Sequence, residues 1–294
     1  MTKDYAEAGK EMDYAYWSQF FAYDIGFGKP SGFVKTASDV HGLIEAFHGA
    51  AKAIGLMARC EKMKDILRSE FATKYIIPDI NKESRLGRII VTCRGENFYG
   101  ESASQIDLMQ HLLQAKLPGD SPLPIQDTKA ELLILMFAGS DTTAATMRHL
   151  LLYALRNPKV YTRLMEEMDT FVATHPPFDV IPYDDAQSLP YFTACLRETM
   201  RIAPSTPIGM PRHRRGGITL PEPDGRYIPE HIKLICDSFV TQKDKSVYGP
   251  NTHEFNPDRW LGKGNEEKVR EFEKYDLHFG GGARVCLGEN IAYL

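Results

Sequence analysis

The sequence predicts a mainly α-helical fold with a small β region, in one domain. Three features predict it: a helical pattern over 128–156, two shorter helical patterns over 158–172 and 191–202, and a change in composition after Pro204, where proline and glycine become frequent. Short β-type runs at 217–220 and 231–235 then predict a small sheet with turns.

Residues 1–75 also show helical periodicity, interrupted by the glycine- and proline-rich breaker cluster 26–32. Apolar residues recur at helical spacing over 40–60, which predicts a helix there. Residues 78–101 are poorly periodic, so we expect loop or weak strand in that stretch.

Capping signals set the expected limits of the later helices. Thr128 and Glu131 form the T-x-x-E pattern of a capping box, so we expect the long helix to begin near Thr128. It should end at Arg156, before Asn157-Pro158, after about 28 residues or about 42 Å, which is long enough to cross a domain. The last residues, 289–294, resemble the start of another helix.

Composition and charge exclude several classes of function. The chain is 43% hydrophobic and 25% charged, as in globular proteins, and its net charge of -4 gives no reason to expect a nucleic-acid partner. The five cysteines are widely spaced without a C-x-x-C pair, which argues against a disulfide framework or a zinc site and favours a reducing compartment. No apolar run approaches the roughly 20 residues of a membrane helix, and the polar residues 1–11 resemble neither a signal peptide nor an anchor.

The strongest chemical signal is the stretch 279–288, F-G-G-G-A-R-V-C-L-G. Its three consecutive glycines allow a tight turn and close approach to a flat ligand. Arg284 supplies a cation for an anionic group such as a propionate, and Cys286 precedes a helix start, where the helix dipole favours a thiolate. Two other interpretations are a glycine-rich turn with a buried cysteine, and a phosphate-binding loop, although the latter requires Lys-Ser or Lys-Thr where Cys286-Leu287 stands.

The complete pattern F-x-x-G-x-R-x-C-x-G resembles the haem-binding loop of the cytochrome P450 family. All five fixed positions are present, as Phe279, Gly282, Arg284, Cys286 and Gly288. The resemblance implies an incomplete cytochrome P450 fold in which Cys286 is the thiolate ligand of the haem iron, where a thiolate donates charge and favours O–O cleavage.

A second motif is similar to one of the same family. Glu198 and Arg201 lie at i and i+3 on one face of a helix and can form an ion pair, which alone indicates little. The family carries such an E-x-x-R pair, completed by a second arginine from a later loop, and Arg259 in F-N-P-D-R-W takes that place. The resemblance therefore implies a structural network of Glu198, Arg201 and Arg259.

The basic run 212–215 is the one local concentration of positive charge. Pro211-Arg212 resembles the strand on which the family places another propionate-binding arginine, which implies a haem contact for Arg212. The alternative is a surface basic cluster in which Arg212 does not differ from Arg214 and Arg215.

A polar motif interrupts the apolar long helix at 138–142, A-G-S-D-T. Gly139 lets a bulky group lie against the helix, Ala138 and Thr142 share a face, and a threonine can bond a carbonyl one turn back and bend the helix. An acid beside an alcohol suits proton delivery, but a helix-packing contact with a solvated acid is equally compatible. The motif is similar to that of the family's oxygen-binding helix, which implies that Ala138 and Gly139 lie against the cofactor, that Asp141 supplies protons and that Thr142 relays them.

Together these resemblances imply a monooxygenase with haem b (iron protoporphyrin IX). It would use dioxygen and two electrons from an NADPH-dependent reductase to insert one oxygen atom into a small apolar organic substrate. As a whole, the sequence resembles most the fungal members of the cytochrome P450 family that act on secondary metabolites. The family's anchor, early helices and chain end are unmatched, so we expect 1–294 to be a single partial domain. The resemblance also implies the cytoplasmic face of the endoplasmic reticulum membrane, reached only through a segment absent from this chain.

Two other functions stay open at this point. The first is a truncated, catalytically incompetent haem-binding fragment. The second is a haem-thiolate isomerase or a peroxide-using enzyme, although those members tend to lose the acid-threonine pair that Asp141 and Thr142 provide.

Overall fold

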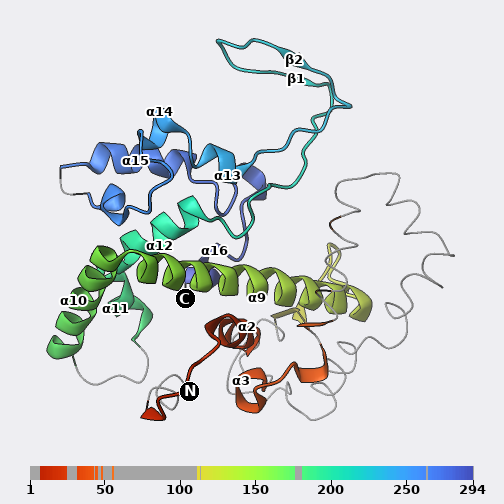
Figure 1. Ribbon diagram of the computed structural model, residues 1–294. Helices are drawn as coiled ribbons and strands as arrows, with labels where there is room; N and C mark the ends of the chain where they lie inside the picture. Colours follow the sequence, from red (N-terminus) through yellow and green to blue (C-terminus); the bar gives the residue numbers. More distant parts are fainter. Residues whose placement is uncertain are drawn as a thin grey trace. The chain divides into compact units, whose positions relative to one another are not determined.

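Helices dominate the computed structural model, and the β region is a single two-stranded sheet within the described part of the chain (Figure 1). The structure describes residues 7–24, 32–42, 44, 45, 48, 55, 111, 112, 114–175, 181–262 and 264–293. Two compact units divide the chain, Met1–Ala144 and Ala145–Leu294. Of the helices in the described ranges, none has the length and apolar character needed to cross a membrane.

The first unit contains α2 (Tyr14–Asp24), α3 (Phe33–Thr36), the 3-10 turn η2 (Val40–Gly42) and the beginning of α9 (Ile125–Arg156). Its core forms where Phe20 and Phe33, both fully buried, meet with ring centroids 6.0 Å apart. Helix α9 joins this core through the buried Ser140, whose hydroxyl donates to the Ala22 carbonyl at 3.3 Å.

The helix expected over 40–60 lies largely outside the described residues. Within it, η2 occupies Val40–Gly42, and residues 44, 45, 48 and 55 are helical. Helix α2 ends at Asp24, before the breaker cluster, of which only Gly32 is described. The stretch 78–101 also lies outside the described residues.

Helix α9 begins three residues earlier than the capping box predicts, so that prediction is wrong. The backbone N–H of Thr128 donates to the Pro124 carbonyl at 3.0 Å, and its hydroxyl donates to the same carbonyl at 3.2 Å. Thr128 is thus a first-turn residue, and the helix extends back toward Pro124 because a proline has no N–H that would need a partner at a helix start. The predicted end at Arg156 is confirmed, and Pro158 starts the next helix.

The second unit continues with α10 (Pro158–Thr174), α11 (Tyr183–Gln187) and α12 (Pro190–Ile202), and the two longer helices match their predicted ranges within two residues. One carboxylate of α10 caps α12: Glu167 accepts the backbone N–H groups of Tyr191 and Phe192, each at 2.8 Å. This satisfies donors that a helix start leaves without intrahelical partners and fixes α12 against α10.

The remaining helical elements follow α12 in the chain. They are α13 (Ser238–Thr241), α14 (Lys245–Tyr248), η3 (Pro257–Trp260), α15 (Glu266–Tyr275), η4 (Gly282–Arg284) and α16 (Glu289–Tyr293). Helix α16 confirms the helix start expected at the end of the sequence. The core cluster of Ala194, Tyr248, Trp260 and Phe272 packs α12 against α14, η3 and α15. Within it the Phe272 ring lies 5.1 Å from Tyr248 and 5.8 Å from Trp260.

The sheet is a hairpin of β1 (Ile218–Thr219) and β2 (Tyr227–Ile228), antiparallel with Ile218 opposite Ile228. The run predicted at 217–220 is confirmed in β1, whereas the run at 231–235 forms no strand and contributes only the isolated bridge of Leu234 with Arg212. The chain reverses after Leu220, whose N–H donates to the Arg226 carbonyl at 2.9 Å, so the residues directly after the turn pair with β1. Gly217 has φ 71, and a side chain there would collide with the Ile228 carbonyl.

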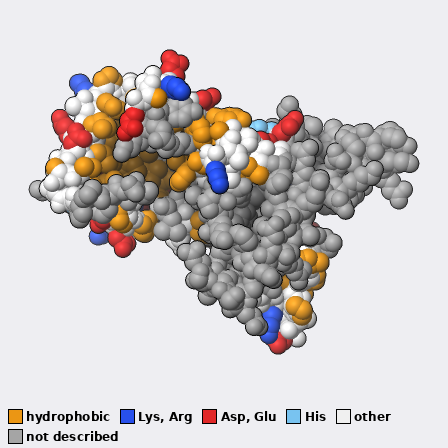
Figure 2. Space-filling model, turned by 90° about the horizontal axis from the view of Figure 1, so that it is seen from below, with side chains coloured by type: hydrophobic (Ala, Val, Ile, Leu, Met, Phe, Trp, Pro, Cys, Tyr) orange, Lys and Arg blue, Asp and Glu red, His pale blue; other side chains and the backbone are white. Residues whose placement is uncertain are grey.

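The surface beside α10 mixes apolar and charged side chains, as the left of Figure 2 shows, on the side where α10 lies in Figure 1. A groove between α10 and the start of α12 is lined by Phe171 and Leu189 together with Glu166 and Glu167. Glu167 is half-buried and engaged by the helix start, whereas its neighbour Glu166 is exposed. The two adjacent glutamates therefore provide a matched pair for testing the cap.

We predict that Glu167→Ala lowers the free energy of unfolding by about 1–2 kcal/mol, because two N–H groups of α12 lose their acceptor. Urea denaturation measures this change, and Glu166→Ala is the control, which we expect to stay within about 0.5 kcal/mol of the unmodified protein. Equal losses for the two variants would show that the cap does not contribute.

Candidate functional site

The glycine-rich stretch 279–288 is a tight loop between α15 and α16. The N–H of Cys286 donates to the Phe279 carbonyl at 2.8 Å and so closes the loop at its base. Gly280 and Gly282 have φ values of 78 and 65, a left-handed backbone that residues with a side chain rarely adopt. The glycines are therefore what allows the chain to turn back and bring the Cys286 amide to Phe279.

The thiol and the guanidinium of this loop are exposed to solvent. Cys286 and Arg284 are exposed, Leu287 is 97% exposed, and Phe279 is half-buried with its ring centroid 5.4 Å from that of Tyr293. The interpretation of a turn with a buried cysteine is therefore wrong. A side chain at Gly288 would contact the Cys286 sulfur, because its Cβ position lies 3.9 Å from Sγ.

This donor set fits the group that the sequence implies. An exposed thiol, a bare glycine backbone and a guanidinium on one segment suit a flat, anionic macrocycle with a metal at its centre. Within the described ranges no group of three or more His, Cys, Asp or Glu side chains is placed to hold a metal ion. Cys286 is the residue of this loop that would hold such a metal, as a thiolate.

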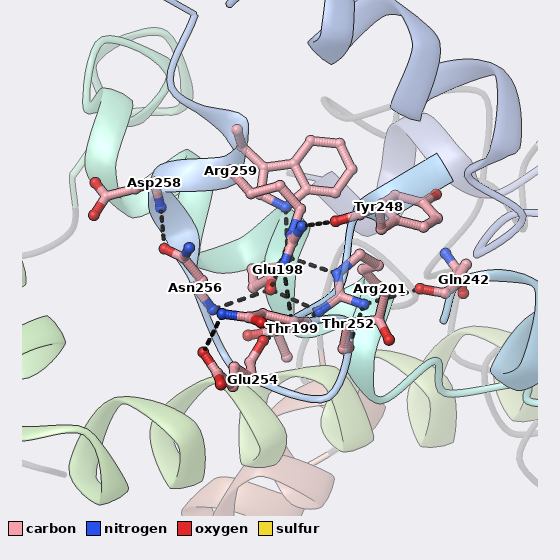
Figure 3. Close-up of polar contacts among 12 residues, drawn as sticks. Glu198, Thr199, Arg201, Gln242, Tyr248, Thr252, Glu254, Asn256, Asp258 and Arg259 are labelled. Carbon is pink, nitrogen blue, oxygen red and sulfur yellow. Dashed lines mark hydrogen bonds and ion pairs between the residues drawn. The ribbon is translucent and has the colours of Figure 1, made fainter. Parts of the chain in front are cut away.

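Glu198 on α12 is the centre of a buried polar network (Figure 3). Its side chain is fully buried, and both carboxylate oxygens are saturated. Oε1 accepts from the Arg201 guanidinium at 2.7 Å and from the Asn256 backbone N–H at 3.0 Å. Oε2 accepts from Arg201 Nε at 2.8 Å and from the Trp260 indole N–H at 2.8 Å. Four donors thus replace the water that the carboxylate loses on burial.

Arg201 is fully buried as well, and backbone carbonyls accept its remaining hydrogens. Its Nη1 donates to Gln242 at 2.9 Å and to Thr252 at 2.8 Å, and its Nη2 reaches Glu254 at 3.3 Å. The same guanidinium therefore pairs with Glu198 and fastens two later segments of the chain to α12.

Arg259 approaches the pair from η3. Its Nε lies 3.6 Å from Glu198 Oε1, while its two terminal nitrogens donate to the carbonyls of Tyr248 and Asn251. Burial lowers the pKa of Arg259, and the Glu198 carboxylate raises it in partial compensation. The structure thus brings together Glu198, Arg201 and Arg259, the three residues that the sequence groups by resemblance.

Two contacts outside the network hold the loop that carries Arg259. Tyr153 stacks on Phe255 with ring centroids 5.0 Å apart, and Arg163 of α10 pairs with Asp258 while lying 4.1 Å over the Tyr191 ring. Beside the network on α12, Cys195 is fully buried, and burial raises the pKa of its thiol to about 12.

Arg212 lies in the segment that leads to the hairpin. Its backbone forms an isolated antiparallel bridge with Leu234, with bonds of 2.8 and 2.7 Å, so the residue has a strand-like setting. The side chain is exposed, and its guanidinium donates to the carbonyls of Met210 and Pro211.

The polar motif of α9 belongs to the first unit. Thr142 donates to the Ala138 carbonyl one turn back at 2.6 Å, as the sequence predicts for a threonine in this setting. Asp141 is half-buried and accepts from the Gln19 side chain of α2 at 3.4 Å, and Gln19 in turn lies 3.2 Å from the His48 ring. A side chain at Gly139 would meet nothing within 4 Å, so this face of α9 is open to a neighbour.

Sequence reasoning missed part of the network. Trp260 stands within the F-N-P-D-R-W motif, and its indole donor beside a buried acid is the one signal that would have indicated its contact with Glu198. Gln242 and Thr252 carry no such signal, because they contribute backbone carbonyls that any residue possesses.

Comparison with known proteins identifies relatives along almost the whole chain. A model of the cytochrome P450 family matches residues 60–294. Cytochrome P450 monooxygenase ACRTS1 of Alternaria alternata is 30% identical, with 98% of this chain and 78% of that protein covered. Quiannulatic acid synthase of Emericella variicolor is 28% identical, and cytochrome P450 monooxygenase cfoH of Aspergillus candidus is 27% identical. The chain spans 59% and 54% of these last two proteins, respectively.

We predict that Glu198→Ala abolishes soluble, folded protein, because its removal leaves the Arg201 charge buried without its partner at a cost of roughly 3–5 kcal/mol. Circular dichroism and thermal unfolding measure the effect. Glu273→Ala is the control, since Glu273 pairs with Arg197 at 2.9 Å on the surface, where loss of an ion pair costs about 0–1 kcal/mol. A Glu198→Ala protein with an unchanged melting temperature would assign Glu198 a role other than stabilising the fold.

Proposed function

Because the chain belongs to the cytochrome P450 family, we propose that it acts as a haem-dependent monooxygenase with Cys286 as the thiolate ligand of the iron. The observation that carries this proposal is the loop 279–288, whose glycine backbone and closing Cys286–Phe279 bond leave an exposed thiol beside the exposed Arg284. When bound, haem b supplies the activation of dioxygen from which one oxygen atom is inserted into the substrate.

The site residues have separate roles in this proposal. Cys286 would hold the iron as a thiolate, and Arg284 and Arg212 would neutralise the propionates. Phe279, Gly282 and Gly288 shape the loop around the sulfur. The buried network of Glu198, Arg201 and Arg259 holds α12 and the segments on which the loop depends and takes no part in the chemistry.

The polar motif of α9 is proposed to handle protons. Ala138 and Gly139 provide a bare helix face for the cofactor, Asp141 supplies protons and Thr142 passes them on. The half-buried setting of Asp141, with Gln19 as a donor, supports a position from which a carboxylate exchanges protons with its surroundings. The same acid-threonine pair argues against an isomerase or a peroxide-using enzyme.

Both compact units are proposed to be parts of one domain, because the family match runs without interruption through the boundary at Ala144. The partners are an NADPH-dependent reductase, dioxygen and a small apolar organic substrate. The fungal relatives, one of them named quiannulatic acid synthase, support a substrate from secondary metabolism. By family, the place of action is the cytoplasmic face of the endoplasmic reticulum membrane.

A second candidate function is haem binding without turnover. The chain spans 78% of ACRTS1, 59% of quiannulatic acid synthase and 54% of cfoH. Two measurements separate the two functions: the haem-to-protein ratio, and NADPH-dependent oxidation of a fluorogenic alkyl ether in the presence of a reductase. Turnover of the ether supports the enzyme. Stoichiometric haem without turnover supports the binding fragment.

We predict that the haem-loaded protein, reduced and exposed to carbon monoxide, shows the red-shifted absorption band of thiolate ligation. Cys286→Ala should abolish this band, because the substitution removes the sulfur that would hold the iron. Cys236→Ala is the matched control, since Cys236 is also an exposed free cysteine. A Cys286→Ala protein that keeps the band would remove Cys286 as the ligand.

We predict that Thr142→Ala keeps haem binding but diverts electrons from product to peroxide, because delivery of protons by a positioned side chain contributes typically about 10²–10⁴-fold. The measurement is product and peroxide formed per NADPH consumed with the fluorogenic ether, and Thr143→Ala is the neighbouring-hydroxyl control. An unchanged ratio in Thr142→Ala would exclude Thr142 from proton delivery.

A further inference from the structure

A chain of hydrogen bonds leaves the buried network and ends in the cysteine loop. Its first link is Arg201, which donates to the Gln242 carbonyl at 2.9 Å, as Figure 3 shows for these two labelled residues. Gln242 is fully buried. Because its carbonyl accepts from Arg201, the Glu198–Arg201 pair fixes its position.

The second link is the Gln242 side chain. Its Nε2 donates to Asp276 Oδ1 at 2.7 Å, which is a short bond to a charged acceptor. Asp276 follows α15 directly, at the point where the chain leaves the helix for the loop. The side chain of Gln242 thus connects the segment after α13 to the beginning of the loop segment.

The third link is Asp276 itself, since the same oxygen accepts the backbone N–H of His278 at 3.0 Å. Two donors from different segments therefore converge on one carboxylate oxygen. The His278 ring lies 4.8 Å from the Phe279 ring, and Phe279 provides the carbonyl that accepts the Cys286 amide. Burial lowers the pKa of His278, while Asp276 and a hydrogen bond to the Met200 backbone on α12 raise it.

We propose that Asp276 is a positioning residue for the cysteine loop, which it connects through Gln242 to the buried Glu198–Arg201 pair. The carboxylate sets the direction in which the chain enters the loop and thereby the place of the Phe279 carbonyl and of the Cys286 amide that binds it. The proposal rests on the proposed function for the role of Cys286, but the hydrogen bonds through Asp276 form within the protein and need no haem.

The first test needs no haem. Amide hydrogen exchange is measured by mass spectrometry in the full chain and in Asp276→Ala, where we expect peptides covering 278–286 to exchange about tenfold faster while peptides of α12 stay protected. Asp276→Asn, which keeps an acceptor oxygen, should restore most of the protection. Asp244→Ala is the matched control: Asp244 accepts from Ser246 in the same unit and should leave 278–286 unchanged.

The second test uses the haem-loaded protein. Asp276→Ala should convert part of the thiolate-type carbon monoxide band to the form typical of a neutral or lost thiol ligand, and Asp276→Asn should recover it. If Asp276→Ala does not fold, Gln242→Leu removes the donor on the other side of the carboxylate and should give the same loop-confined exchange and spectral change.

The outcomes separate this proposal from the proposed function. Faster exchange confined to 278–286 supports a positioning role, even if the chain binds no haem. If the unmodified protein shows the thiolate band and neither Asp276→Ala nor Gln242→Leu changes the amide exchange or the spectrum, the positioning role is overturned and Cys286 stays the ligand. Faster exchange spread evenly over α12 and α15 also overturns it, because Asp276 would then act only on overall stability.

Discussion

Glu198 carries its negative charge at a position without exposed surface, and taking a carboxylate out of water costs several kcal/mol unless other donors replace the water. Only two of its four hydrogen bonds come from its own helix, through Arg201. The others come from the Asn256 backbone and the Trp260 indole, so residues 251–261 must fold back over α12. The compact course of that loop follows from the need to satisfy one buried acid.

The two arginines that face Glu198 leave one positive charge in excess within the same small volume. Backbone carbonyls absorb it: Arg201 donates to those of Gln242 and Thr252, and Arg259 to those of Tyr248 and Asn251. Three of these carbonyls lie outside helices and that of Tyr248 ends α14, so neutralising the charge also fixes the path of the chain. In contrast, the cysteine loop is exposed, and its turn depends on the left-handed backbone of Gly280 and Gly282.

The sequence predicts the long helices of the second unit well because periodicity and proline mark their limits locally. It misses the start of α9, where the Pro124 carbonyl accepts the N–H of Thr128. It also expects the second strand at 231–235, where only Leu234 forms a bridge, because the residues directly after the turn pair with β1. The three charged residues of the network are predictable by motif. The acceptors of Arg201 are not predictable from the sequence, because they are backbone carbonyls, which every residue has.

Cys195 gives the protein an internal reporter of its own unfolding. Its thiol is fully buried on α12, and burial raises its pKa to about 12, whereas Cys236 and Cys286 are exposed. Only a thiolate that solvent can reach is alkylated, so a maleimide reagent applied to the folded chain distinguishes Cys195 from these two cysteines. Labelling of Cys195 would therefore record the moments at which α12 separates from the core, and its rate would follow the opening of the helix that holds Glu198.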